Sequence, residues 1–166
     1  IFDIAREVLG VDFKKLIFEG TAEDLAATEV TQPLLLTANQ AIWKTSNISP
    51  SEVELMAGHS LGEYSALVLA GVLAFEDAIA VVHRRGKFMQ GAVGPGEGKM
   101  AAIVGLDDTK LIEICARAET IGTVSAANFN SPGQIVIAGE SAAVDYAVER
   151  CKEAGAKRAL PLNVSV

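Results

Sequence analysis

The sequence has little of what nucleic-acid-binding and membrane-spanning proteins require. Its 14 lysines and arginines stand against 21 aspartates and glutamates, a formal net charge of −7. A nucleic-acid binder needs a basic face to meet phosphates. The longest apolar stretch, residues 66–75, is about half of the roughly 20 residues that a membrane span needs. We therefore expect neither nucleic acid nor membrane as a partner, and no secretory signal is visible.

Cysteine and histidine are also scarce. The two cysteines, Cys115 and Cys151, lie far apart, and there are two histidines and no Cys-x-x-Cys pair. This argues against a disulfide scaffold or a zinc site, and no metal is expected. Half of the 166 residues are hydrophobic and 21% are charged, which excludes disorder and allows a sizeable core. The composition indicates an acidic globular protein, which we expect in the cytoplasm.

Patterning divides the chain into two parts, of which the first, residues 1–96, is mostly helical. Thr21-x-x-Asp24 resembles a helix start, and Pro33 is expected in the first turn of its helix. The expected elements are helices over 1–9, 31–45, 61–70 and 76–93 and a short apolar strand over 52–57. A glycine-rich connector, residues 94–98, follows.

The second part, residues 97–162, alternates strands and helices. Strands are predicted over 99–106, 123–129, 134–138 and 157–162, and helices over 107–118 and 141–154. This βαββαβ order is the split βαβ of ferredoxin-like folds, inserted in a larger α/β domain to which residues 163–166 would return. Because position 1 is Ile and the last residues are apolar, we expect a piece of a longer chain.

The segment Gly58-His59-Ser60-Leu61-Gly62 fits the pattern Gly-x-Ser-x-Gly. Between an apolar segment and a helix, this pattern is typical of a sharp turn that exposes a nucleophilic serine. The Leu61 amide, at the positive end of the helix, would then point where an oxyanion forms. The alternative is a tight turn in which Ser60 caps the helix.

A serine nucleophile needs a base. His59 is adjacent to Ser60 and is expected to point away from it, and His83 is expected to be solvated in the middle of a helix. The base is therefore missing or lies outside this chain.

Arg85 falls on the apolar stripe of the helix predicted over 76–93. A guanidinium there must find an anion, either an internal carboxylate such as Glu63 or Asp77 or a ligand carboxylate. Lys157 and Arg158 form a basic pair that either is solvated or contacts a phosphate. The segment 128–134 is predicted to be a turn whose amides could also face a ligand.

Four segments together resemble one family, the bacterial malonyl-CoA:acyl-carrier-protein transacylases. They are Gly-His-Ser-Leu-Gly-Glu-Tyr-Ser-Ala-Leu (58–67), Arg-Gly-Lys-Phe-Met-Gln (85–90), Asn-Phe-Asn-Ser-Pro-Gly-Gln-Ile-Val-Ile-Ala-Gly (128–139) and Gly-Ala-Lys-Arg-Ala-Leu-Pro-Leu (155–162). The resemblance implies an α/β-hydrolase-like large subdomain, incomplete here, with a ferredoxin-like insertion.

The resemblance also implies an activity: transfer of malonyl from malonyl-CoA to the phosphopantetheine thiol of acyl carrier protein, for fatty acid synthesis. Ser60 would carry the malonyl group, Leu61 would supply an oxyanion amide and Arg85 would bind the malonyl carboxylate. Residues Asn128, Asn130 and Arg158 would contact coenzyme A or the acyl chain. We expect a monomer without a bound cofactor, and Leu61 after the serine resembles malonyl-selective members.

Two alternatives stay open, a serine esterase or lipase of α/β-hydrolase type and a non-catalytic module that binds carrier protein. Two departures from the family matter as well. Its opening Gly-Gln-Gly-Ser-Gln segment has no counterpart here. Its catalytic histidine and a later glutamine would follow Val-Ser-Val at 164–166.

The 166-residue chain alone is therefore expected to be catalytically inactive. Transfer of malonyl from coenzyme A to a carrier protein, followed by mass spectrometry of the carrier, measures this. Transfer at the rate of a full-length family member would contradict the expectation.

Overall fold

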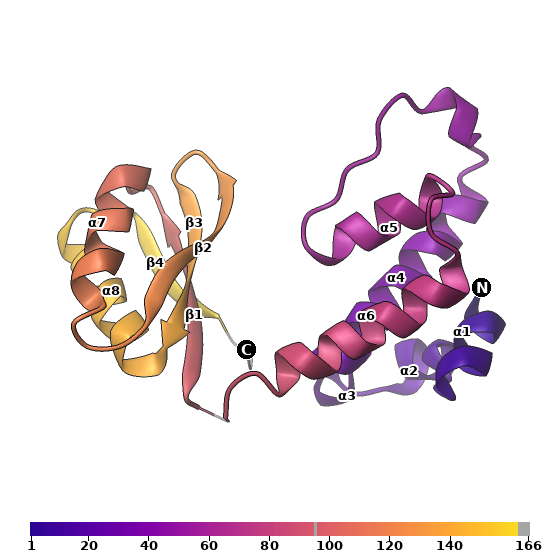
Figure 1. Cartoon of the computed structure of the whole chain (residues 1–166), viewed down its shortest axis with the longest axis horizontal. Helices are drawn as coiled ribbons and strands as arrows, with labels where there is room; N and C mark the ends of the chain where they lie inside the picture. The colour runs from indigo at the N-terminus through magenta and orange to yellow at the C-terminus, as the bar shows by residue number, and fades with distance from the viewer. Residues whose placement is uncertain (95, 163–166) are drawn as a thin grey trace. The chain divides into compact units, whose positions relative to one another are not determined.

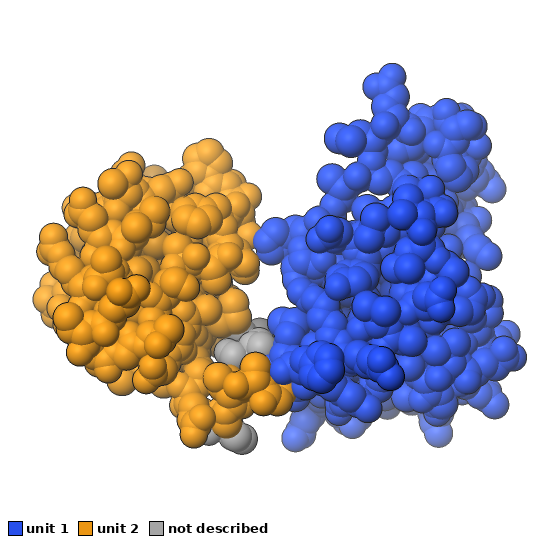
Figure 2. All heavy atoms as spheres, viewed as in Figure 1, with its two compact units in different colours: residues 1–90 blue, residues 91–166 orange. Residues whose placement is uncertain are grey.

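The structure is a computed structural model that describes residues 1–94 and 96–162. It divides into two units, Ile1–Gln90 and Gly91–Val166 (Figure 2). The boundary predicted after residue 96 lies in the stretch that connects the last helix of unit 1 to the first strand of unit 2. The predicted return at residues 163–166 lies outside the described residues.

The regular elements in the described part of unit 1 are all helices (Figure 1). Its elements are α1 (Phe2–Leu9), α2 (Phe13–Glu19), α3 (Ala22–Ala26), α4 (Thr28–Thr45), the 3-10 turn η1 (Pro50–Glu52), α5 (Leu61–Leu69) and α6 (Phe75–Gln90). Gly10 ends α1 in the left-handed conformation, and Thr21 and Asp24 form the capping box of α3. These local signals confirm the predicted ends of both helices.

Helix α4 begins one turn before the prediction, at Thr28, so Pro33 lies in its second turn. Proline has no N–H to donate to the carbonyl four residues back, which is that of Glu29. His83 satisfies this carbonyl instead, because its Nδ1 lies 3.0 Å from the Glu29 oxygen and donates to it. The expectation that His83 is solvated is therefore wrong: the ring is half-buried and holds α6 against α4.

The strand predicted over 52–57 does not form. Glu52 belongs to η1, and Val53–Ala57 is irregular. A strand needs a neighbour to accept and donate backbone hydrogen bonds. The described part of unit 1 contains no other strand, so this apolar segment has nothing to pair with there.

Helices α4 and α6 lie in close backbone contact at Gly86. A Cβ at this glycine would lie 2.6 Å from the Glu29 Cα and 2.7 Å from the Thr28 oxygen. Real Cβ atoms do not approach a backbone so closely, so any larger residue would push the helices apart. The interface also has an apolar core, in which Leu36 of α4 and Ile79 and Val82 of α6 are fully buried.

Unit 2 consists of β1 (Gly98–Val104), α7 (Asp108–Ala118), β2 (Val124–Ser131), β3 (Gln134–Glu140), α8 (Ser141–Glu153) and β4 (Arg158–Leu162). The strands form an antiparallel sheet in the order β2-β3-β1-β4, and α7 and α8 cover one face of it (Figure 1). This is the ferredoxin-like arrangement, and the mixed α/β class is confirmed. Asp107 caps α7, because its side chain accepts a hydrogen bond from the Lys110 N–H.

The core of unit 2 lies between the sheet and the two helices and contains both cysteines, Cys115 and Cys151. Burial raises the pKa of both thiols, that of Cys151 to about 11. Both thiols therefore stay protonated and unreactive near pH 8 while unit 2 is folded.

None of the helices in the described residues is long and apolar enough to cross a membrane.

Gly86→Ala is expected to destabilise unit 1 by about 1–3 kcal/mol, because its methyl group collides with the backbone of α4. The single Trp, Trp43 of α4, reports on unit 1. Its fluorescence in a urea titration should show unfolding at a lower urea concentration than in wild type. The urea concentration at which the two cysteines become accessible to alkylation should stay the same, because unit 2 is unchanged.

Gly62→Ala is the matched control, because a Cβ at this helical glycine has nothing within 4 Å. In this variant the urea midpoint of the Trp43 fluorescence transition should stay unchanged or rise slightly, since alanine favours a helix by up to about 1 kcal/mol over glycine. Equal effects of the two substitutions would show that the close contact at Gly86 does not matter.

Candidate active site

Ser60 lies on a strained turn directly before α5. Its φ of 54° and ψ of −114° lie outside the regions that residues with side chains prefer. Such a conformation costs roughly 1–3 kcal/mol and persists only where the surroundings enforce it. The turn therefore has the geometry that the Gly-x-Ser-x-Gly pattern predicts.

Gly58 allows the turn to close. A Cβ there would lie 1.9 Å from the Gly62 carbonyl carbon and 2.4 Å from the Glu63 nitrogen. The backbone before the serine thus passes directly against the first turn of α5, where no side chain fits. Gly62, in contrast, has open space around it.

The Leu61 N–H is the first amide of α5. No described residue accepts a hydrogen bond from it, as expected for the first turn of a helix. This amide lies at the positive end of the helix dipole, next to Ser60. It is available to stabilise negative charge that develops on an acyl oxygen.

The Ser60 hydroxyl does not cap α5. Its Oγ instead accepts a hydrogen bond of 2.8 Å from Nη2 of Arg85, on α6. Ser60 thus occupies the N-cap position of α5, but the capping hydrogen bond from its side chain that the alternative interpretation requires does not form. The structure brings together the two side chains that the sequence analysis singled out most strongly.

The Arg85 guanidinium is surrounded by neutral groups. Its Nη1 donates to the Gln32 Oε1 at 2.5 Å, and its Cζ lies 5.9 Å from the centre of the Tyr64 ring. Among the described residues no carboxylate pairs with it, so the internal ion pair with Glu63 or Asp77 does not form. The positive charge beside Ser60 is left uncompensated and open to a ligand.

Neither histidine contacts Ser60 among the described residues. His59 is exposed, and the Nδ1 of His83 is engaged by Glu29. The described residues therefore bring a candidate nucleophile, a free helix amide and a cation together, and neither histidine of the described residues is hydrogen-bonded to Ser60 as a base would be.

The other candidate residues lie in unit 2 and are not brought together. Asn128 and Asn130 lie on edge strand β2, and Arg158 begins the opposite edge strand, β4. Three strand spacings of about 4.8 Å separate the two edges. Asn130 and Arg158 are exposed and Asn128 is half-buried. Asn130 belongs to β2 and not to the turn that was predicted for it.

Sequence analysis missed Gln32 and Tyr64. Gln32 is 5% exposed, on the same stripe of α4 as the buried Leu36. A polar residue on an apolar helical stripe was the signal that singled out Arg85, and it could have found Gln32 too. Tyr64 follows Ser60 by one helical turn, which is the only sequence signal for its position.

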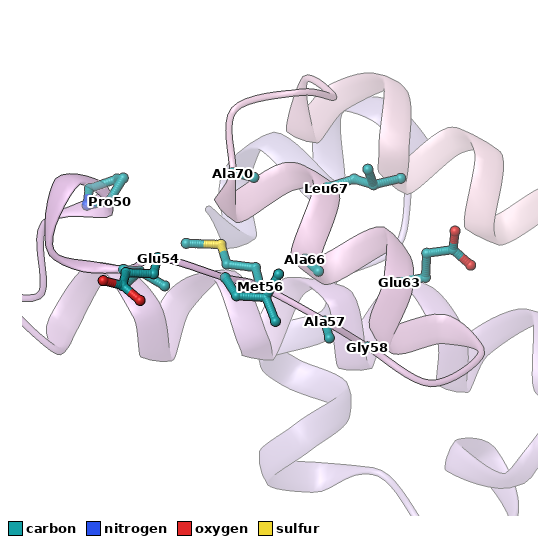
Figure 3. A pocket seen from close by; sticks show the side chains of 11 residues that line it. Pro50, Glu54, Met56, Ala57, Gly58, Glu63, Ala66, Leu67 and Ala70 are labelled. Atoms are coloured by element: carbon teal, nitrogen blue, oxygen red, sulfur yellow. The ribbon is translucent and has the colours of Figure 1, made fainter.

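A pocket of about 560 Å³ lies between the segment before Ser60 and α5 (Figure 3). Its labelled lining includes Pro50, Met56, Ala66 and Leu67, and neither Ser60 nor Arg85 lines it. It adjoins the turn at Ser60 through Gly58 and Glu63. Within residues 1–94 and 96–162, no three His, Cys, Asp or Glu side chains are grouped to hold a metal ion.

Comparison with known proteins identifies the family. The model of the acyl transferase domain matches residues 4–166. The chain belongs to the acyl transferase domain family. The resemblance drawn from the four segments is confirmed by relatives that are named malonyl CoA-acyl carrier protein transacylase.

The relative from Haemophilus influenzae is 56% identical to this chain, and the match covers 99% of this chain and 54% of the relative. The relative from Bacillus subtilis is 50% identical, and the match covers 99% of this chain and 52% of the relative. The malonyl CoA-acyl carrier protein transacylase structure from Coxiella burnetii has a TM-score of 0.94 at 46% identity, covering 99% of this chain and 52% of that one. The chain thus spans about half the length of the relatives that it matches.

A further matching structure is a malonyl-transacylase in complex with the acyl-carrier protein of a type II polyketide synthase. It is 53% identical, with a TM-score of 0.92, over 99% of this chain and 54% of that chain. The likeness covers both units of this acyl transferase domain.

Gly58→Ala is expected to break the turn, because the added methyl group cannot fit against α5. Ser60 should then leave its positive φ and lose the bond from Arg85. NMR should show this as large shifts of the amide signals of residues 58–63 and of the Arg85 side chain.

Gly62→Ala again serves as control, since open space surrounds that position. In this variant the Arg85 side-chain signals should stay in place. Unchanged Arg85 signals in Gly58→Ala would contradict the argument that Gly58 sets the geometry of the site.

Proposed function

We propose that the full-length protein transfers a malonyl group from malonyl-CoA to the phosphopantetheine thiol of acyl carrier protein, through a malonyl-serine at Ser60. The observation that carries the proposal is the uncompensated guanidinium of Arg85, whose Nη2 lies 2.8 Å from the Ser60 Oγ. A cation at this distance from a nucleophile suits an acyl group that ends in a carboxylate. The names of the relatives support the same substrates.

In the first half-reaction a base removes the Ser60 proton, and Oγ attacks the thioester carbonyl carbon. The Leu61 N–H donates to the oxyanion of the tetrahedral intermediate. The C–S bond then breaks, and the thiol of coenzyme A leaves with the proton. In the second half-reaction the carrier thiol, deprotonated by the same base, attacks the serine ester, the C–O bond breaks and Ser60 regains its proton.

Arg85 has two successive roles in this scheme. In the free site its N–H donates to the Ser60 Oγ and leaves the hydroxyl proton free for the base. Once the malonyl group is attached, the guanidinium turns from Oγ to the carboxylate. A neutral acyl group would leave this cation without a partner, which disfavours its transfer. An esterase would have no use for Arg85 at this position.

Because His59 and His83 do not contact Ser60 in the described structure, we place the base outside this chain. We also propose Asn128, Asn130 and Arg158 as contacts to coenzyme A or the acyl chain; Arg158 and Asn130 are open to solvent, as such a role requires. We further propose a monomer in the cytoplasm that works without a bound cofactor.

Intact mass of the full-length protein after incubation with malonyl-CoA or acetyl-CoA tests the proposal. We expect a malonyl adduct that Ser60→Ala abolishes and that acetyl-CoA does not match. In Arg85→Ala the rate of malonyl attachment should fall by roughly 100-fold or more, since a charge-assisted pair is lost. Acetyl attachment should rise relative to malonyl.

Arg84→Ala is the matched control, because Arg84 is the exposed neighbour of Arg85. It should keep the preference for malonyl. The absence of a malonyl adduct from folded full-length protein would favour an esterase or a carrier-binding module. An unchanged preference for malonyl over acetyl in Arg85→Ala would contradict the proposal that Arg85 binds the malonyl carboxylate.

A further inference from the structure

Gln32 makes both of its amide hydrogen bonds to α6. Its Oε1 accepts from the Arg85 Nη1 at 2.5 Å, and its Nε2 donates to the Met89 Sδ at 3.3 Å. A guanidinium only donates, so the oxygen of this amide must face Arg85. The side chain is 5% exposed, so water does not compete for these contacts.

The two terminal nitrogens of Arg85 therefore point at different partners. Nη1 is held by Gln32 and Nη2 reaches Ser60. Rotation of the guanidinium about its Nε–Cζ bond would break both hydrogen bonds together. The Tyr64 ring faces the same guanidinium, and its centre lies 5.9 Å from the Arg85 Cζ.

We propose that Gln32 is a positioning residue for acyl selectivity: it holds the Arg85 guanidinium in the orientation that receives a substrate carboxylate, without neutralising its charge. This inference rests on the proposed function. The amide matters because it is a neutral acceptor. A carboxylate at position 32 would form a permanent ion pair with Arg85 and compete with the substrate.

Gln32→Glu tests the charge, because it keeps the size and the acceptor of the side chain. In the full-length protein, KM for malonyl-CoA should rise about 10- to 100-fold, the range expected when one charge-assisted hydrogen bond is lost. The rate with acetyl-CoA should stay within about twofold of wild type, so that the malonyl-to-acetyl preference falls.

Asn39→Asp is the matched control, an amide-to-carboxylate change on the same helix. Asn39 is exposed and its Nδ2 donates to the Ser65 Oγ at 3.0 Å, away from Arg85. It should keep the malonyl preference. An unchanged preference in Gln32→Glu, or an equal loss in Asn39→Asp, would overturn the proposal.

A second measurement does not depend on the reaction. Nitrogen-15 NMR of the Arg85 side chain reports how fast its guanidinium rotates about Nε–Cζ. We expect slow rotation in wild type and several-fold faster rotation in Gln32→Leu. Equal rates would overturn the positioning role.

The two measurements separate the two proposals. A wild-type protein that is not acylated by malonyl-CoA, but in which Gln32 slows the guanidinium, would refute the proposed function and retain the positioning role. A wild-type protein that is acylated by malonyl-CoA, but whose Arg85 guanidinium rotates freely, would retain the proposed function and refute the positioning role of Gln32.

Discussion

The site depends on how closely α4 and α6 approach each other at Gly86. Three successive turns of α6 contact the start of α4. His83 donates a hydrogen bond to the Glu29 carbonyl, and Gly86 lies against the backbone of Thr28 and Glu29. One turn further on, the Gln90 side chain accepts a hydrogen bond of 3.0 Å from the Thr28 N–H. Arg85 is adjacent to this glycine. A side chain at position 86 would therefore separate the helices where Arg85 must reach both Gln32 on α4 and Ser60 before α5.

Pro33 helps to set the register of this contact. A proline in the second turn of a helix deprives one carbonyl of its intrahelical partner, and a buried carbonyl without a partner is unfavourable. Here that carbonyl belongs to Glu29, and His83 occupies it. Because Arg85 follows His83 by two residues, the bond that compensates for the proline also fixes how α6 is turned toward the site.

Residues whose signals are local were predictable, and those that depend on distant partners were not. The caps at Gly10, Thr21 and Asp107 and the turn at Ser60 follow from short patterns, and the structure has all four. The strand predicted over 52–57 requires a neighbour that the described part of unit 1 does not contain. The position of Arg85 on an apolar stripe predicted that its guanidinium needs a partner. The sequence could not choose between Glu63, Asp77 and a ligand, because that choice depends on which residues the tertiary fold brings close to Arg85.

Under the proposed function, the neutral surroundings of Arg85 would provide a selectivity that the serine turn alone could not provide. A strained serine beside a free amide attacks any acyl group of suitable size, and such turns occur in many hydrolases. A half-buried guanidinium bound by an amide, a hydroxyl and an aromatic ring remains a full positive charge. An internal carboxylate would stabilise the free site more but would also remove that charge. In the proposed reaction, neutral acceptors in place of an ion pair would leave the Arg85 charge free to bind the substrate carboxylate, and the discrimination between acyl groups would arise from that contact.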